Sequence, residues 1–185
     1  MKKLFIALAA VVAFCASATT IEVGAGRMGV ASTPGKTTQD NTFVAVRQAT
    51  AYGTLDGALT YGNTDGAQGN TNGYEVGYSY PVSLKKFTVI PRVFVGNTTE
   101  LGTEGHFYGT SVEWRLPLTA KLGGFANVDY RKGSVEATGS LRKTYSFGVD
   151  YPVSKAVSIR ASYRHANLGG NELQNGVQGV VSYSF

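Results

Sequence analysis

The last eleven residues of the sequence, Asn175-Gly-Val-Gln-Gly-Val-Val-Ser-Tyr-Ser-Phe185, follow a period of two. From Val177 to Phe185 the odd-numbered positions hold mostly apolar or aromatic side chains, whereas most even-numbered positions hold polar or small ones. Successive side chains of a β-strand point to opposite faces, so this pattern predicts a strand with one apolar and one polar face.

The same alternation extends through the chain beyond residue 18, for example over residues 143–151 and 156–165. No segment there combines a helical period with capping residues, so we predict an all-β protein. The alternation divides the chain into ten strands, at about residues 20–30, 42–49, 52–62, 73–80, 87–96, 105–116, 121–132, 141–151, 156–166 and 174–185.

The links between these strands alternate in length. The short links fall near residues 50, 81–86, 117–120 and 152–155. The longer links, of about 7–11 residues and rich in Gly, Asn and Thr, fall at 31–41, 63–72, 97–104, 133–140 and 167–173. An even number of antiparallel strands, with short turns at one end and longer loops at the other, predicts a ten-stranded antiparallel transmembrane β-barrel. If residues 20–50 do not form two paired strands, an eight-stranded barrel over residues 52–185 is the alternative.

A short sequence repeat supports a repeated hairpin. Tyr80-Pro81-Val82-Ser83, Leu116-Pro117-Leu118-Thr119 and Tyr151-Pro152-Val153-Ser154 each fall in a short link, and a Lys follows each within a few residues. Proline ends a strand and favours a turn, so the repeat unit is a strand, a long loop, a strand and a short turn.

The first eighteen residues have the features of a secretory signal peptide. Lys2 and Lys3 precede an apolar run from Leu4 to Phe14, and Ala16-Ser17-Ala18 supplies the small residues of a cleavage site. We therefore predict a signal peptide over residues 1–18 and one barrel domain over residues 19–185. Phe14 is too bulky for the position before a lipidated cysteine, so Cys15 is predicted to leave with the signal peptide, and the mature chain then has no disulfide.

The aromatic residues form two predicted rows, one at each end of the strands, as in the interface belts of membrane barrels. The row at the short-turn end consists of Tyr52, Tyr80, Phe87, Trp114, Tyr151, Tyr183 and Phe185. The row at the long-loop end consists of Tyr61, Tyr74, Tyr108, Tyr130, Tyr145 and Tyr163.

If the apolar face meets lipid, the opposite face carries a balanced set of charges. It holds six acids and six bases: Glu22, Arg47, Asp56, Glu75, Arg92, Glu113, Arg115, Asp129, Arg131, Asp150, Arg160 and Arg164. All six bases are Arg, which binds carboxylates through a planar fork and suits a crowded lumen better than Lys does. We predict that these twelve residues form a charge network inside the barrel, because unpaired buried ions are costly.

The alternating C-terminus, with Val181, Tyr183 and a final Phe185, resembles the signature of bacterial outer-membrane β-barrel proteins. The resemblance implies that the barrel-assembly machinery reads this strand, that both termini lie in the periplasm, and that the protein sits in the outer membrane among its lipids and lipopolysaccharide. Small members of this class include structural barrels, adhesins, narrow pores and lipid-modifying enzymes, so the resemblance leaves the function open.

Two interpretations of the charged lumen remain from the sequence. In the first, the ion pairs lock side chains across a narrow barrel, and the protein is a non-catalytic barrel with a largely closed lumen. In the second, the same side chains line a narrow pore for ions or small solutes.

A third interpretation is lipid A modification. The segment around His165 is similar to the C-terminal active-site region of outer-membrane lipid A deacylases, which place a His two residues before a nucleophilic Ser. Only His165 matches, because Asn167 at the nucleophile position has no hydroxyl to form an acyl-enzyme. Ser162 has the opposite strand parity from His165, and Glu172 is the only acid shortly downstream. We therefore predict no catalytic residue.

Other partners are not indicated by the composition. The formal charge is +5, or +3 once Lys2 and Lys3 are removed, and no basic stripe with interleaved aromatic residues suggests nucleic-acid binding. The two histidines, His106 and His165, lack acids at metal-ligand spacing. We predict a monomer with no cofactor and no metal.

Two residues do not fit a regular barrel. Pro91 falls within a predicted strand, where it should cause a bulge or remove a hydrogen bond of the ladder. Arg27 falls on the lipid-facing parity of the first strand, either close enough to the loop end for lipopolysaccharide phosphates to pair with it or in a strand shifted by one residue.

Overall fold

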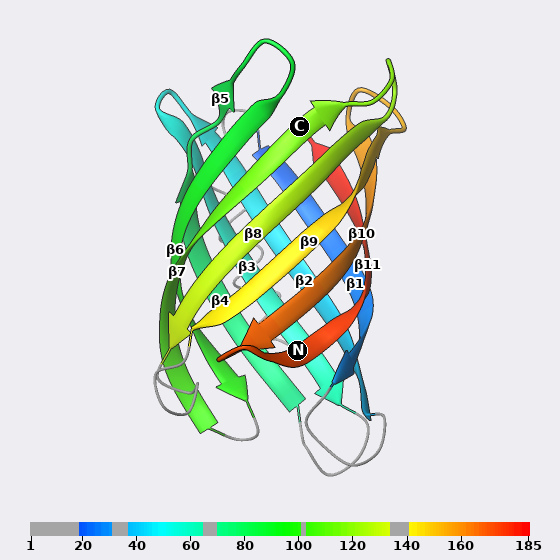
Figure 1. Cartoon of the computed structure of the whole chain (residues 1–185). Coiled ribbons are helices and arrows are strands. Elements are labelled where there is room, and N and C mark those ends of the chain that lie inside the picture. Colours follow the sequence, from blue (N-terminus) through cyan, green and yellow to red (C-terminus); the bar gives the residue numbers. More distant parts are fainter. Residues whose placement is uncertain (1–18, 31–36, 65–69, 101–102, 134–140) are drawn as a thin grey trace.

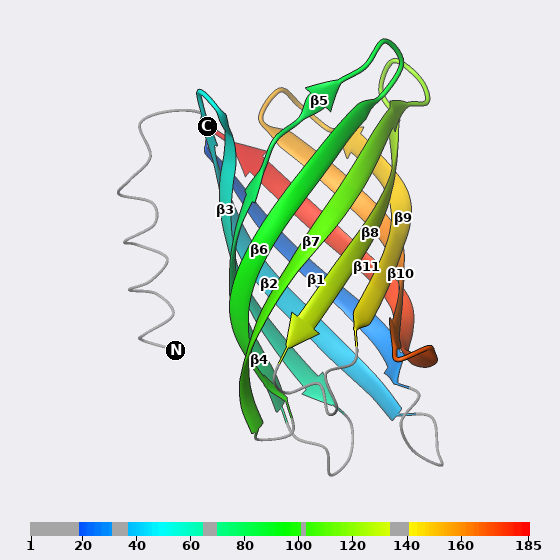
Figure 2. The same cartoon turned by 60° about the vertical axis from the view of Figure 1, so that its left-hand side comes forward.

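The strands of this chain lie side by side around a cylinder and are tilted relative to its axis (Figures 1 and 2). A computed structural model describes residues 19–30, 37–64, 70–100, 103–133 and 141–185; the predicted signal peptide lies outside these residues. Within these ranges, no helix is long and apolar enough to cross a membrane. The strands are β1 (Thr19–Val30), β2 (Thr37–Thr50), β3 (Gly53–Thr64), β4 (Asn70–Ser79), β5 (Val82–Ser83), β6 (Thr88–Glu100), β7 (Thr103–Pro117), β8 (Gly123–Gly133), β9 (Arg142–Pro152), β10 (Val157–Leu168) and β11 (Asn171–Ser184).

The sheet closes on itself because every long strand has two antiparallel neighbours. β1 pairs with β2 and with β11, and β4 pairs with β3 and with β6. β5 continues β4 in the same register against β6, since Ser79 pairs with Arg92 and Val82 pairs with Val89. The predicted ten-stranded barrel is confirmed. The eight-stranded alternative is wrong, because residues 37–50 pair with both β1 and β3.

One end of the barrel, which we call the turn side, carries the short connections, β5 and the C-terminus (Figure 2). Two of the three Pro repeats form the same turn there. Leu118 N donates to Leu122 O (2.8 Å), and Val153 N donates to Val157 O (2.9 Å). In each turn a hydroxyl, that of Thr119 or Ser154, accepts hydrogen bonds from the backbone N–H groups two and three residues ahead. The third repeat extends instead through β5.

We expect the Ser154→Ala variant to unfold at a lower urea concentration than the parent in detergent. The change removes the acceptor of the Ala156 and Val157 N–H groups, at 3.2 and 3.0 Å. Water can replace the hydroxyl at this exposed turn, so the loss in free energy of unfolding should be about 0.5–1.5 kcal/mol. Ser154→Thr keeps the hydroxyl and serves as the control. Equal midpoints for the Ala and Thr variants would contradict this role of the hydroxyl.

Pro91 removes one hydrogen bond from the ladder and causes no bulge. Tyr80 N donates to Pro91 O at 3.1 Å, but Pro91 has no N–H with which to return the bond. The paired strand is interrupted at Tyr80 and Pro81 and then resumes as β5 without a change of register. The predicted irregularity is therefore a missing bond, placed where β4 meets the turn side.

At the opposite end, the loop side, the strands run further than the sequence predicts. β2 begins at Thr37 instead of about residue 42, and only two residues separate Leu168 from Asn171. The predicted long link at 167–173 is thus wrong. Gly169 and Gly170 have φ values of 58° and 94°, and a two-residue hairpin turn needs such positive values. β10 and β11 extend to this turn, with one register shift between Ala166 and Asn167.

The outer surface of the barrel is apolar and aromatic. All thirteen aromatic residues of the two predicted rows are exposed, and Val, Leu and Ile side chains are exposed between them. Such a surface is the one that a membrane barrel turns toward lipid. Arg27 interrupts it near the loop side, where its Nε bonds Asp40 Oδ1 at 2.9 Å on the paired position of β2. Since Arg27 pairs in register, the predicted one-residue shift of β1 does not occur.

Candidate functional site: the charged lumen

The side chains opposite the apolar surface enclose two adjoining cavities inside the barrel. The loop-side cavity has a volume of about 410 Å³ and the turn-side cavity about 260 Å³. The two cavities share six lining residues: Phe43, Ala58, Glu75, Asp129, Arg164 and Gln178. The polar interior is therefore continuous from one cavity to the other along its wall.

Six ion pairs between described lumen residues form three groups, which we call the ion-pair belt. The first joins Arg47 Nη2 to Glu22 Oε2 at 3.0 Å. The second joins Arg92 to Asp56 and, at 2.6 Å, to Glu75 Oε1. The third joins Arg160 to Asp150 Oδ1 at 2.6 Å and to Glu113 Oε2 at 3.1 Å, and Arg115 bonds the other oxygen of Glu113. All residues of the belt line the turn-side cavity except Asp150, which is bonded to Arg160.

Two arginines of the belt reach across intervening strands. Arg92 on β6 crosses β4 to reach Asp56 on β3, where its Nε lies 3.0 Å from Oδ1. Arg160 on β10 crosses β9 and β8 to reach Glu113 on β7. We call these two contacts chords, because each joins two separate points of the barrel wall through the interior. The belt therefore fills part of the lumen as well as lining its wall.

Gly77 on β4 provides the space through which Arg92 reaches Asp56. A Cβ added at Gly77 would lie 2.6 Å from both Cζ and Nε of Arg92, which is closer than real Cβ atoms approach other atoms. The Arg92–Asp56 contact therefore requires that residue 77 has no side chain.

Four phenylalanines also face the lumen: Phe43, Phe94, Phe107 and Phe125. The rings of Phe94 and Phe107 cover Gly109 and Gly96 on the paired strand positions, as aromatic residues do for glycines in designed sheets. Three of the rings form cation–π contacts with a guanidinium. Arg92 Cζ lies 4.8 Å from the centroid of Phe94, and Arg131 Cζ and Arg160 Cζ lie 4.1 Å from the centroids of Phe107 and Phe125, respectively. The sequence analysis did not identify these rings, although Phe94 shares its strand parity with Arg92.

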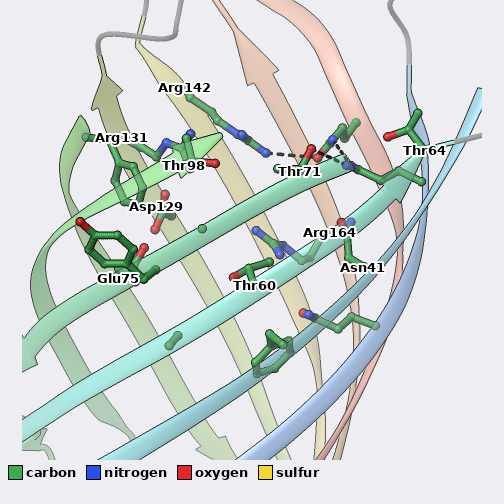
Figure 3. A pocket seen from close by; sticks show the side chains of 18 of the residues that line it. Asn41, Thr60, Thr64, Thr71, Glu75, Thr98, Asp129, Arg131, Arg142 and Arg164 are labelled. Carbon is green, nitrogen blue, oxygen red and sulfur yellow. Dashed lines mark hydrogen bonds between the residues drawn. The ribbon is translucent and has the colours of Figure 1, made fainter. Parts of the chain in front are cut away.

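The loop-side cavity has a different character, because arginine outnumbers acid among the described residues that line it (Figure 3). It is lined by Arg131, Arg142 and Arg164, against Asp129 and Glu75. A chain of side-chain hydrogen bonds runs from Arg142 through two glutamines to Thr71. Arg142 Nη2 donates to Gln174 Oε1 (3.1 Å), Gln174 Nε2 donates to Gln39 Oε1 (2.6 Å), and Gln39 Nε2 donates to Thr71 Oγ1 (3.1 Å).

The structure places all twelve residues of the predicted charge network in the lumen. Ten line the turn-side cavity, Arg131 lines the loop-side cavity, and Asp150 contacts Arg160. The sequence analysis missed Arg142, although this residue falls within the predicted strand 141–151 and has the same parity as Asp150 on β9.

The residues considered for catalysis do not come together. Ser162 lines the turn-side cavity, whereas His165 has the opposite parity and pairs with Tyr145 and Asn175 on the neighbouring strands. Among the residues that the structure describes, no three His, Cys, Asp or Glu side chains are grouped so that they could hold a metal ion.

The predicted C-terminal signal lies on the outer surface of β11 and just beyond it. Val181 and Tyr183 pair with Val23 and Ile21 of β1, and Phe185 N donates to Thr19 O at 3.0 Å. The rings of Tyr183 and Phe185 contact each other edge to face, with centroids 4.8 Å apart. Recognition of this strand during assembly stays a prediction.

No protein-family model matches this chain, and no curated protein matches it significantly. Solved structures share its fold. The β domain of the Bordetella autotransporter BrkA has a TM-score of 0.59 at 14% identity, covering 91% of this chain and 99% of that chain. The NanC porin has a TM-score of 0.53 at 12% identity, covering 89% and 100%. An outer-membrane channel from Pseudomonas putida F1 has a TM-score of 0.53 at 14% identity, covering 92% and 97%.

These similarities show the fold. It is the antiparallel β-barrel of bacterial outer-membrane proteins, and the apolar aromatic surface described above is the lipid-facing surface of such a barrel.

Proposed function

We propose that this protein is a non-catalytic, monomeric integral barrel of the bacterial outer membrane whose lumen is largely closed by the ion-pair belt. The observation that carries the proposal is the pair of chords across the lumen, Arg92 to Asp56 and Arg160 to Glu113. Lipids and lipopolysaccharide surround the outer face, and the barrel-assembly machinery inserts the chain through its C-terminal strand.

Physical chemistry supports closure on the turn side. Each belt arginine is held by one or two carboxylates, and two of them also stack on a phenylalanine ring. Guanidinium groups fixed at several points lose the side-chain freedom that would let them swing aside for a solute. A barrel of about eight strands is already narrow enough to be filled by side chains, and ten strands add little width.

A narrow pore is the second candidate, and the adjoining cavities favour it. Together they extend from Val30 and Thr64, the last residues of β1 and β3 at the loop side, to Arg47 and Arg115 near the turn side. A water-filled path of this kind would be lined by opposed Arg and acidic side chains, which would set its ion selectivity.

Single-channel recording separates the two candidates. Residues 19–185 are refolded, shown to be folded by heat-modifiable gel mobility, and added to a planar bilayer. We expect no discrete conductance steps from this protein and discrete steps from the Arg92→Ser/Arg160→Ser double variant, in which both chords are removed.

The control for that experiment is Arg27→Ser, which removes an arginine from the outer face and should stay silent. Reproducible steps from the unchanged protein would overturn the closed-lumen proposal in favour of the pore. In that case Arg92→Glu should shift the reversal potential toward cation permeation, because the lining then carries more negative charge.

Lipid A modification has no equivalent support. His165 has Asn167 where the deacylases place their nucleophile, and the nearest upstream serine, Ser162, lines the turn-side cavity inside the barrel. We therefore assign no enzymatic role to this segment.

A further inference from the structure

The three proline repeats share a feature that the lumen does not explain: each leads into a turn-side turn that contains lysine (Figure 1). In every repeat a backbone N–H donates to a carbonyl across the turn, from one apolar residue to another. The donor and acceptor residues are Leu84 and Phe87, Leu118 and Leu122, and Val153 and Val157, and the lysines between them are Lys85 with Lys86, Lys121 and Lys155. The repeat therefore places basic side chains inside turns whose ends are apolar.

These three turns are neighbours around the barrel. They join β5 to β6, β7 to β8 and β9 to β10, and these six strands are consecutive in the order of the sheet. The fourth short turn, between β2 and β3, carries no charged residue. The lysines thus occupy one continuous part of the turn-side rim. We call Lys85, Lys86, Lys121 and Lys155 the basic arc.

The basic arc is a surface of one sign of charge. The structure describes all four short turns, and none of them contains Asp or Glu. The C-terminal carboxylate of Phe185 is at the same end of the barrel, but it lies beside β1, where Phe185 N donates to Thr19 O. All four lysines are exposed, and none of them lines either lumen cavity. The arc is therefore basic surface outside the lumen.

Exposed apolar side chains accompany the lysines. The residue after the proline of each repeat is Val82, Leu118 or Val153, and these are 40%, 49% and 54% exposed. At the end of a membrane strand, an apolar side chain can contact acyl chains while a neighbouring lysine extends its ammonium to the headgroups. A soluble anion would use the lysines alone, so the apolar neighbours favour a phospholipid.

Two of the turns are held by side-chain hydroxyls. Thr119 Oγ1 accepts hydrogen bonds from the backbone N–H groups of Lys121 at 3.2 Å and of Leu122 at 3.0 Å. Ser154 Oγ accepts one from Ala156, the residue after Lys155, at 3.2 Å. The backbone that carries these lysines is ordered before a lipid arrives, which lowers the entropy cost of binding.

We propose that the basic arc selects anionic phospholipids, of the phosphatidylglycerol type, from the leaflet at the turn side. Lysines next to an anionic membrane surface attract it over about a Debye length, so the selection should weaken as salt is added. This inference deepens the lipid contact proposed above and rests on the barrel lying in a membrane. It does not depend on whether the lumen is closed.

Trp114, the only tryptophan of the chain, reports on lipids at this surface. It is 40% exposed and pairs with Val89 on β6 and Ala126 on β8, between the first two lysine turns. Refolded residues 19–185 are placed in vesicles of brominated phosphatidylcholine, which quenches a tryptophan that it touches. Unbrominated phosphatidylglycerol then replaces a rising share of that lipid, and unbrominated phosphatidylcholine gives the recovery curve for no preference. We expect phosphatidylglycerol to bind beside Trp114 about threefold or more tightly than phosphatidylcholine, with the preference falling as NaCl is added.

Matched variants, each shown to be folded by heat-modifiable gel mobility, test the lysines themselves. Lys121→Gln should reduce the preference about twofold, and the Lys85→Gln/Lys86→Gln/Lys121→Gln triple variant should abolish it. Lys121→Arg keeps the charge and should keep the preference. Lys132→Gln loses the same charge from an exposed position at the loop-side end of β8 and should behave like the parent.

Coinciding recovery curves for the two lipids in the parent would overturn the proposal. Equal losses of preference from Lys121→Gln and Lys132→Gln would overturn it too, because the charge would then act without regard to position. Conductance of the same protein is scored separately. Discrete steps with an intact lipid preference would overturn the closed lumen alone.

Discussion

The Arg160→Ala variant should lose about 2–3 kcal/mol of unfolding free energy in urea titrations of the refolded barrel. Arg160 Nε bonds Asp150 at 2.6 Å and Nη1 bonds Glu113 at 3.1 Å, with its side chain 17% exposed. Glu113 keeps Arg115 when Arg160 is removed, but Asp150 loses its partner in the belt. Breaking a fully buried ion pair costs about 3–5 kcal/mol, and water in the adjoining cavity should reduce that cost here.

The matched comparison is Arg27→Ala on the outer face. Arg27 and Asp40 also form a cross-strand ion pair, at 2.9 Å, but their side chains are 65% and 57% exposed. Exposed pairs contribute about 0–1 kcal/mol, so this variant should unfold close to the parent. Arg160→Lys should fall between Arg160→Ala and the parent, because an ammonium cannot bond both carboxylates with the same geometry. Identical midpoints for Arg160→Ala and Arg27→Ala would contradict a stabilising role for the belt.

The strand number and the two faces of the barrel follow from the sequence alone. A period of two, repeated over many segments, identifies strands, and a charge on the lipid face would cost about 2–4 kcal/mol at mid-bilayer. The charged parity must therefore be the inner one. This argument assigns Arg92 and Glu113 to the lumen without any knowledge of their partners.

The strand ends and the pairing of charges could not be predicted in the same way. Gly, Asn and Thr are common in loops, yet residues 37–41 continue β2 because β1 offers paired backbone groups to all five and β3 to residues 39–41. Which acid each arginine meets depends on the curvature of the barrel, since Arg160 bonds Glu113 three strands away. The lumen phenylalanines were missed because an aromatic side chain fits either face, and only its neighbouring glycines show which one it covers.

Gly77 provides the second large effect that we expect. Gly77→Ala should lower the free energy of unfolding by about 1–2 kcal/mol, although alanine is ordinarily well tolerated in place of a strand glycine. Its Cβ would lie 2.6 Å from Cζ of Arg92, so the guanidinium must move. A free arginine would move at little cost, but this one is bonded to both Asp56 and Glu75. Displacing it weakens two ion pairs whose side chains are 11–26% exposed.

A lumen glycine with room for a side chain gives the control. At Gly123 on β8 an added Cβ would meet Cβ of Asp150 at 3.7 Å, an ordinary contact, so Gly123→Ala should be close to neutral. The mechanism also predicts non-additivity: in an Arg92→Ala background there is no guanidinium to displace, and Gly77→Ala should then cost little or nothing further. If Gly77→Ala costs the same in both backgrounds, its effect comes from the backbone of β4 and not from the passage of Arg92 to Asp56. A coupling of about 1 kcal/mol or more would show that a missing side chain on one strand sets the reach of an arginine on another.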